Sequence, residues 1–67
     1  MKELRVYKTR PLARVAIMNF YKDNKPKIEK VYSSHKDQGI VMKDGTTIYF
    51  KSEIPNTKMT YNEIKFY

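Results

Sequence analysis

The sequence predicts an all-β fold, a small single-domain antiparallel meander or partly closed barrel of five to six strands. Three observations support it. Asp-Gly at positions 44–45 separates two β-rich runs, residues 14–21 are rich in β-branched and aromatic side chains, and Ile64 and Phe66 alternate with charged residues near the end of the sequence. A chain this short buries one core, so residues 1–67 are expected to form one small basic β domain. The alternative is an α+β fold with a helix near 11–22.

The N-terminal half is expected to begin with a strand at 4–7, ended before Pro11. Residues 14–21 follow as a longer strand, which a turn at 23–24 joins to a strand at 27–33, with Pro26 at the margin. The competing helix draws on residues with helical spacing, namely Leu12, Val15, Ala16, Asn19 and Phe20. The β-branched and aromatic content favours the strand.

The positions of the apolar side chains in the hairpin at 40–51 indicate its register. A type I turn with Gly45 in the bulge position pairs Met42 with Thr46 and Ile40 with Ile48. The apolar side chains then share one face, namely Ile40, Met42, Ile48 and Phe50. A two-residue turn shifts the register by one residue and inverts the faces, so the bulged turn is predicted because it buries more apolar surface.

The C-terminal part is expected to be a loop at 52–59 followed by a terminal strand within 60–67. Thr60 and Glu63 resemble a capping box, but four residues after Glu63 are too few for an independent helix. Ile64 and Phe66 instead alternate with charged residues, which is typical of a half-buried strand.

Charge is distributed unevenly along the chain. The net charge is +7, and residues 1–30 carry nine basic and three acidic groups, a net +6. All three arginines lie within the first 14 residues. Arg offers a planar fork that matches phosphate and stacks on aromatic rings. The first 30 residues are therefore predicted to form the electrostatic face of the protein.

Catalysis, metal binding and membrane spanning receive little support from the sequence. The single histidine, His35, sits among Ser33, Ser34 and Asp37, where sequence neighbours cannot converge as a catalytic triad. One His without Cys supplies no transition-metal set, and two glycines build no phosphate loop. We expect a non-enzymatic protein without cofactor or metal, located in the cytoplasm. Its Lys-, Ile- and Tyr-rich composition is compatible with a bacteriophage or mobile element, which would place it in the host cytoplasm.

Cations interleaved with tyrosines indicate a nucleic-acid-binding or other polyanion-binding function. Phosphates require cations and unpaired bases require flat rings, and alternate strand residues such as Arg5 and Tyr7 share a face. The predicted contact residues are Arg5, Tyr7, Lys8, Arg10, Arg14, Lys25, Lys27, Lys30 and Tyr32.

Two other hypotheses use the same residues: a small inhibitor that docks on an acidic host protein, and a nucleotide-sequestering protein. Residues 15–21 would present apolar groups on both faces of a strand, which either a central strand or a homo-oligomer explains.

Overall fold

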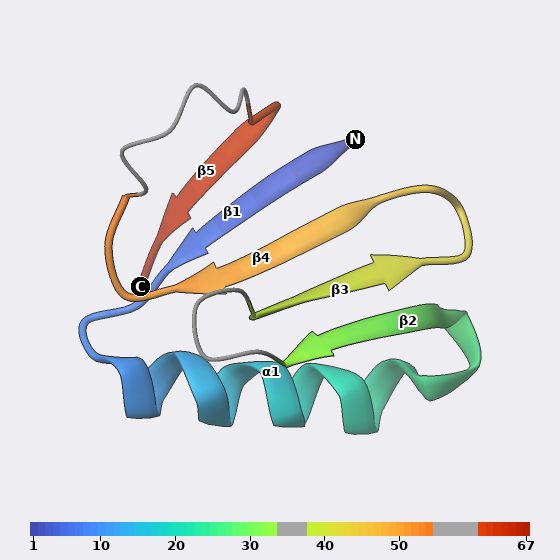
Figure 1. The fold of residues 1–67 in the computed structure, drawn as a ribbon, viewed down its shortest axis with the longest axis horizontal. Helices are drawn as coiled ribbons and strands as arrows, with labels where there is room; N and C mark the ends of the chain where they lie inside the picture. The colour runs from blue at the N-terminus through green and yellow to red at the C-terminus, as the bar shows by residue number, and fades with distance from the viewer. Residues whose placement is uncertain (34–37, 55–60) are drawn as a thin grey trace.

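The computed structural model describes residues 1–33, 38–54 and 61–67. These residues form one sheet and one long helix, in an order shown in Figure 1. The elements are β1 (Lys2–Val6), α1 (Arg10–Asn24), the short 3-10 helix η1 (Lys25–Lys27), β2 (Ile28–Ser33), β3 (Gln38–Met42), β4 (Thr47–Lys51) and β5 (Glu63–Phe66). The fold is therefore a small α+β arrangement, which is the alternative that the sequence left open.

The sheet is mixed, with the strand order β2-β3-β4-β1-β5. Strands β2, β3 and β4 form an antiparallel meander, whereas β1 runs parallel to both of its neighbours, β4 and β5. The predicted antiparallel meander is correct for these three strands only, and the sheet is not a closed barrel. Two of its strands, β2 and β5, lie at opposite edges (Figure 1).

The predicted strand at 14–21 and its turn at 23–24 are wrong, because this segment belongs to α1. Thr9 begins the helix with an extended backbone, and its side chain accepts a hydrogen bond from the Leu12 N–H (3.3 Å). Pro11 lies in the first turn, where its missing N–H is not needed. Ala13 and Ile17 are one turn apart and both are buried against the sheet. Tertiary packing of this face outweighs the β propensity of the segment.

The hairpin between β3 and β4 has the predicted bulged register. Ile40 pairs with Ile48, and the Met42 N–H donates to the Thr46 carbonyl at 2.7 Å. Gly45 has a φ of 94°, in the left-handed region that favours glycine. Asp44 closes the turn by accepting the Thr46 N–H at 2.9 Å, and this hydrogen bond lowers the pKa of Asp44.

The core lies between α1 and the face of the sheet that α1 covers. Ala13 and Ile17 pack there with Ile40, Ile48 and Phe50, as the hairpin register requires. We call this the helix face, and the opposite side of the sheet the outer face. Strand alternation places Leu4 on the outer face, between its register partners Tyr49 and Ile64, and Leu4 is fully buried there.

The terminal strands are confirmed, although their partners were not predicted. The strands expected at 4–7 and within 60–67 are present as β1 and β5, which pair with each other. The strand expected at 27–33 is present as β2, but it pairs with β3. The expected loop at 52–59 and the segment around His35 lie largely outside the described residues.

Candidate functional site

Arg5, a predicted phosphate contact, is held inside the protein's own structure. It extends from β1 on the helix face, where its guanidinium lies 5.1 Å from the Phe20 ring centre and 5.6 Å from that of Phe50. Its Nε donates to the carboxylate of Glu3, which is 5% exposed. Arg5 therefore neutralises a buried acid and covers two rings of the core.

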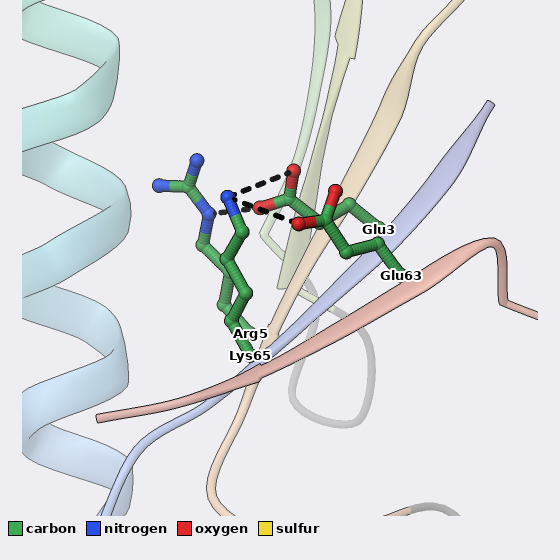
Figure 2. A network of polar contacts seen from close by, with 4 residues as sticks. All are labelled: Glu3, Arg5, Glu63 and Lys65. Carbon is green, nitrogen blue, oxygen red and sulfur yellow. Dashed lines mark hydrogen bonds and ion pairs between the residues drawn. The ribbon is translucent and has the colours of Figure 1, made fainter.

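Glu3 is the centre of a small ion-pair network that joins β1 to β5. Figure 2 shows the Arg5 and Lys65 side chains reaching the Glu3 carboxylate, with Glu63 beside Lys65. The Lys65 ammonium lies 3.4 Å from Glu63 and 3.9 Å from Glu3. Burial on its own lowers the pKa of Arg5, but the hydrogen bond and charge of Glu3 outweigh it and raise that pKa. The Arg5 charge is thus committed to this network.

Tyr7 is also engaged internally. Its ring stacks on Phe50 at 6.2 Å between centres and on Tyr67 at 4.8 Å, with an angle of 9° between the last two rings. Burial raises the pKa of Tyr7 above its ordinary value. Arg5 and Tyr7 share a face as predicted, but that face packs on the core. We call Glu3, Arg5 and Tyr7, together with Phe20 and Phe50, the internal cluster.

Arg10 and Arg14 lie on an exposed flank of α1, together with Tyr21 in its last turns and Lys25, the first residue of η1. Arg10 and Arg14 are one turn apart, Tyr21 and Lys25 repeat that spacing, and seven residues separate the pairs. All four are exposed, and the Lys25 ammonium lies 5.6 Å from the Tyr21 ring centre. We call these four residues the basic row. At 1.5 Å per residue, it extends for about 22 Å along the helix.

The remaining predicted contacts divide between two sides of the molecule. Lys8 is exposed before the helix, and Lys27 is exposed in η1, next to the end of the basic row. Lys30 and Tyr32 lie on the edge strand β2, with the Lys30 ammonium 4.9 Å from the Tyr32 ring centre. Their register partners, Val41 and Gly39, place them on the outer face, away from α1. The structure therefore does not bring all nine residues onto one surface.

Tyr21 is the site residue that the strand interpretation missed. If residues 10–25 are helical, the Tyr21 ring lies between Arg14 and Lys25 on one side of the helix. The two-residue period of a strand does not place these residues together. The signal was present in the sequence as the four-, seven- and four-residue spacing of Arg10, Arg14, Tyr21 and Lys25. It needed the helix assignment to become visible.

The outermost surface of α1 carries apolar side chains. Leu12, Val15 and Met18 are 50%, 54% and 64% exposed, respectively. Their spacing of three residues places them on the side away from the buried Ala13 and Ile17. The helix thus presents an apolar strip next to the basic row.

A shallow hollow of about 270 Å³ lies where η1 meets the β3–β4 turn. Its lining consists of Pro26, Lys27, Met42, Lys43 and Asp44. Two lysines could attract an anion there, but the lining offers no aromatic ring for a base to stack on. The hollow therefore gives less support to a nucleotide pocket than the basic row gives to an extended polyanion.

No known protein family, curated protein or solved structure matches this chain. Among the described residues, no three His, Cys, Asp or Glu side chains are grouped so as to hold a metal ion. The helices within the described ranges are too short or too polar to cross a membrane.

Proposed function

We propose that this protein is a non-enzymatic nucleic-acid-binding protein whose contact surface is the basic row, extended by Lys27. The observation that carries the proposal is the alignment of Arg10, Arg14 and Lys25 on one exposed flank that runs along α1 to the start of η1. Among the described residues, no acidic side chain forms an ion pair with any of these three cations, so their charges face solvent. Cations that are not used internally are available for phosphates.

The dimensions of the basic row fit a phosphate backbone. Phosphates follow one another every 3.4 Å along one strand of duplex DNA, so a row of about 22 Å passes about six of them. Three row cations and Lys27 can each neutralise a phosphate without any bending of the helix. Because helix residues are positioned by the core, this surface is formed before the ligand arrives.

Tyr21 supplies a ring within the row. It is 41% exposed, and the Lys25 ammonium lies near its ring, so a cation and a flat surface occupy the same place. Single-stranded nucleic acid uses this combination, with phosphate on the cation and a base on the ring. The proposal therefore favours single strands over duplex.

Salt dependence of binding is the direct test. With four cations engaged, log Kd for a single-stranded oligonucleotide should change with log salt concentration with a slope of about 2.8, and for duplex about 3.6. Fluorescence anisotropy at several salt concentrations measures both. The double variant Arg10→Ala/Arg14→Ala should halve the single-strand slope to about 1.4.

A matched control uses two exposed lysines that lie outside the row. Lys2→Ala/Lys30→Ala removes the same net charge from the outer face. It should leave the slope near that of the wild type. An equal fall in slope for both double variants would show that binding responds to overall charge, and would refute the basic row as the site.

A second candidate function is docking on an acidic protein surface. The exposed strip of Leu12, Val15 and Met18 supports it, because phosphate binding does not require an apolar surface whereas protein interfaces do. The adjoining cations would then steer the encounter with an acidic partner. A stoichiometric partner that survives nuclease in a pull-down, and is lost in Val15→Ser/Met18→Ser, would favour this function over the first.

A further inference from the structure

We propose that two copies of this chain associate edge to edge through β5, in antiparallel orientation, to form one continuous sheet. The first observation is the position of β5. It pairs with β1 on one side, and no strand among the described residues pairs with its other side (Figure 1). An edge of this kind presents unpaired backbone N–H and C=O groups to a further strand.

The side chains of β5 are unusually apolar and exposed for an edge strand. Ile64 is 43% exposed and Phe66 is 68% exposed, and both register against β1 residues of the outer face. Tyr67, which follows the strand, is 52% exposed. Sheet regions with parallel strands are normally covered on both faces, but no described helix covers the outer face here. Burial of Ile64 and Phe66 would therefore stabilise an association at this edge.

The charges on β5 select a second copy as the occupant. A register centred on Ile64 places Ile64 opposite the same residue of the second copy, and Glu63 opposite Lys65 in both directions. Opposite charges directly across a strand pair are stabilising. A register one residue further on would place Lys65 opposite Lys65, which is unfavourable. The strand is thus complementary to itself in one antiparallel register.

Backbone geometry agrees with this register. The Tyr67 N–H donates inward to the Val6 carbonyl at 2.9 Å, so alternation along the strand directs the N–H and C=O of Glu63 and Lys65 inward to β1 and those of Ile64 and Phe66 outward. Ile64 would therefore exchange both hydrogen bonds with the same residue of the second copy. This central hydrogen-bonded pair would have Cα atoms about 5.5 Å apart.

The distribution of charge also permits this association. An edge lysine usually discourages pairing, but Lys65 lies close to both Glu63 and Glu3, which offset its charge. The basic row lies on α1 and the start of η1, and Lys27 and Lys30 lie toward β2, at the opposite edge of the sheet from β5. Pairing through β5 therefore leaves Lys27 and Lys30 of each copy at the far edges of the joined sheet.

The first test is the mass of the nuclease-treated protein in high salt, measured by sedimentation or light scattering without nucleic acid. The proposal predicts twice the 8.0 kDa chain mass, with return to 8.0 kDa in Ile64→Glu. Val15→Glu, on the exposed side of α1, is the matched control and should remain dimeric. A wild-type mass of 8.0 kDa at every concentration, or dissociation of Val15→Glu as well, would overturn the proposal.

A second test does not depend on Ile64→Glu remaining folded. Because the chain has no cysteine, Ile64→Cys places the only thiol at the centre of the proposed pair. A Cα separation of about 5.5 Å lies within the disulfide range, so mild oxidation should give a covalent dimer. Val15→Cys should not react in this way. Cross-linking by Lys65→Cys in place of Ile64→Cys would overturn the register. Since neither test contains nucleic acid, failure here leaves the proposed function standing, and the reverse also holds.

Discussion

Two short segments with the same pattern, a cation and a tyrosine two residues apart, have different environments in this protein. Arg5 and Tyr7 extend from β1 onto the helix face, where they contact Glu3, Phe20 and Phe50. Lys30 and Tyr32 lie on the edge strand β2, and their cation–ring contact is with each other on the outer face. Spacing alone determines that two residues share a face. Whether that face is covered depends on the helix, which is why one pair stabilises the fold and the other stays exposed.

The largest difference between the two pairs is expected for the cations. Arg5→Ala should lower the free energy of unfolding by about 3 kcal/mol, because it leaves the buried Glu3 carboxylate without its closest cation. Lys30→Ala should change it by less than about 0.5 kcal/mol, as for other exposed positions. Urea denaturation followed by circular dichroism measures both. Equal losses of unfolding free energy in the two variants would show that Arg5 contributes no more to the stability of the fold than Lys30 does.

A double variant separates the buried charge from the packing of Arg5. Glu3→Leu/Arg5→Met removes both charges and keeps much of the side-chain volume. It should recover most of the stability lost in Arg5→Ala, because a buried ion pair can often be replaced by apolar groups without net loss. No recovery would show that the aromatic contacts of the guanidinium, rather than the charge of Glu3, dominate.

The tyrosines should show a smaller difference in the same direction. Tyr7→Ala removes a ring stacked on Phe50 and Tyr67 and should cost about 2 kcal/mol. Tyr32→Ala removes a ring that is 43% exposed and should cost less than about 1 kcal/mol. Thermal melts of the two variants and the wild type give the comparison. A Tyr32→Ala loss as large as that of Tyr7→Ala would mean that the outer face is packed more tightly at β2 than its exposure indicates.

The smallest expected effect is a loss of stability in alkali that depends on Tyr7. Because burial raises the pKa of Tyr7 in the folded state, the unfolded chain releases this proton first as the pH rises. The contribution is fully present below the ordinary pKa of 10.0 and is lost as the pH rises from there toward the folded value. Urea titrations below and above pH 10.0 should show a smaller alkaline loss for Tyr7→Phe than for the wild type. The same loss in both would exclude Tyr7 as the group responsible.

Local features of the fold could be predicted from the sequence, and pairings between distant segments could not. The Asp44-Gly45 turn fixes the register of β3 and β4 within a dozen residues, so the hairpin was correct in detail. Residues 14–21 have side chains suited to either a strand or a helix, and the choice depends on the apolar surface that β3 and β4 provide for Ala13 and Ile17. No local pattern indicates that β1 lies between β4 and β5.

The candidate site was predictable in composition but not in arrangement. Arg10, Arg14 and Lys25 are predicted contacts from charge alone, and the structure aligns them along α1 and the start of η1. Arg5 has an internal role because it contacts the buried Glu3, two residues earlier. The sequence does not indicate this role, because an acidic and a basic residue with that spacing on a strand could equally form an exposed pair. Tyr21 can be recognised as a neighbour of these cations only from the helical period of 3.6 residues.

The central position of β1 bears on how the chain folds. Its register partners on β4 are 45 positions away and those on β5 are 60 positions away, whereas β2 pairs with the next strand, β3, and β3 with the next, β4. Loop-closure entropy makes distant pairings slow, so the meander should form early and the pairing of β1 should limit the rate. Until that pairing occurs, the apolar side of β1 and the carboxylate of Glu3 remain hydrated, so the strand that is synthesised first is among the last to be paired.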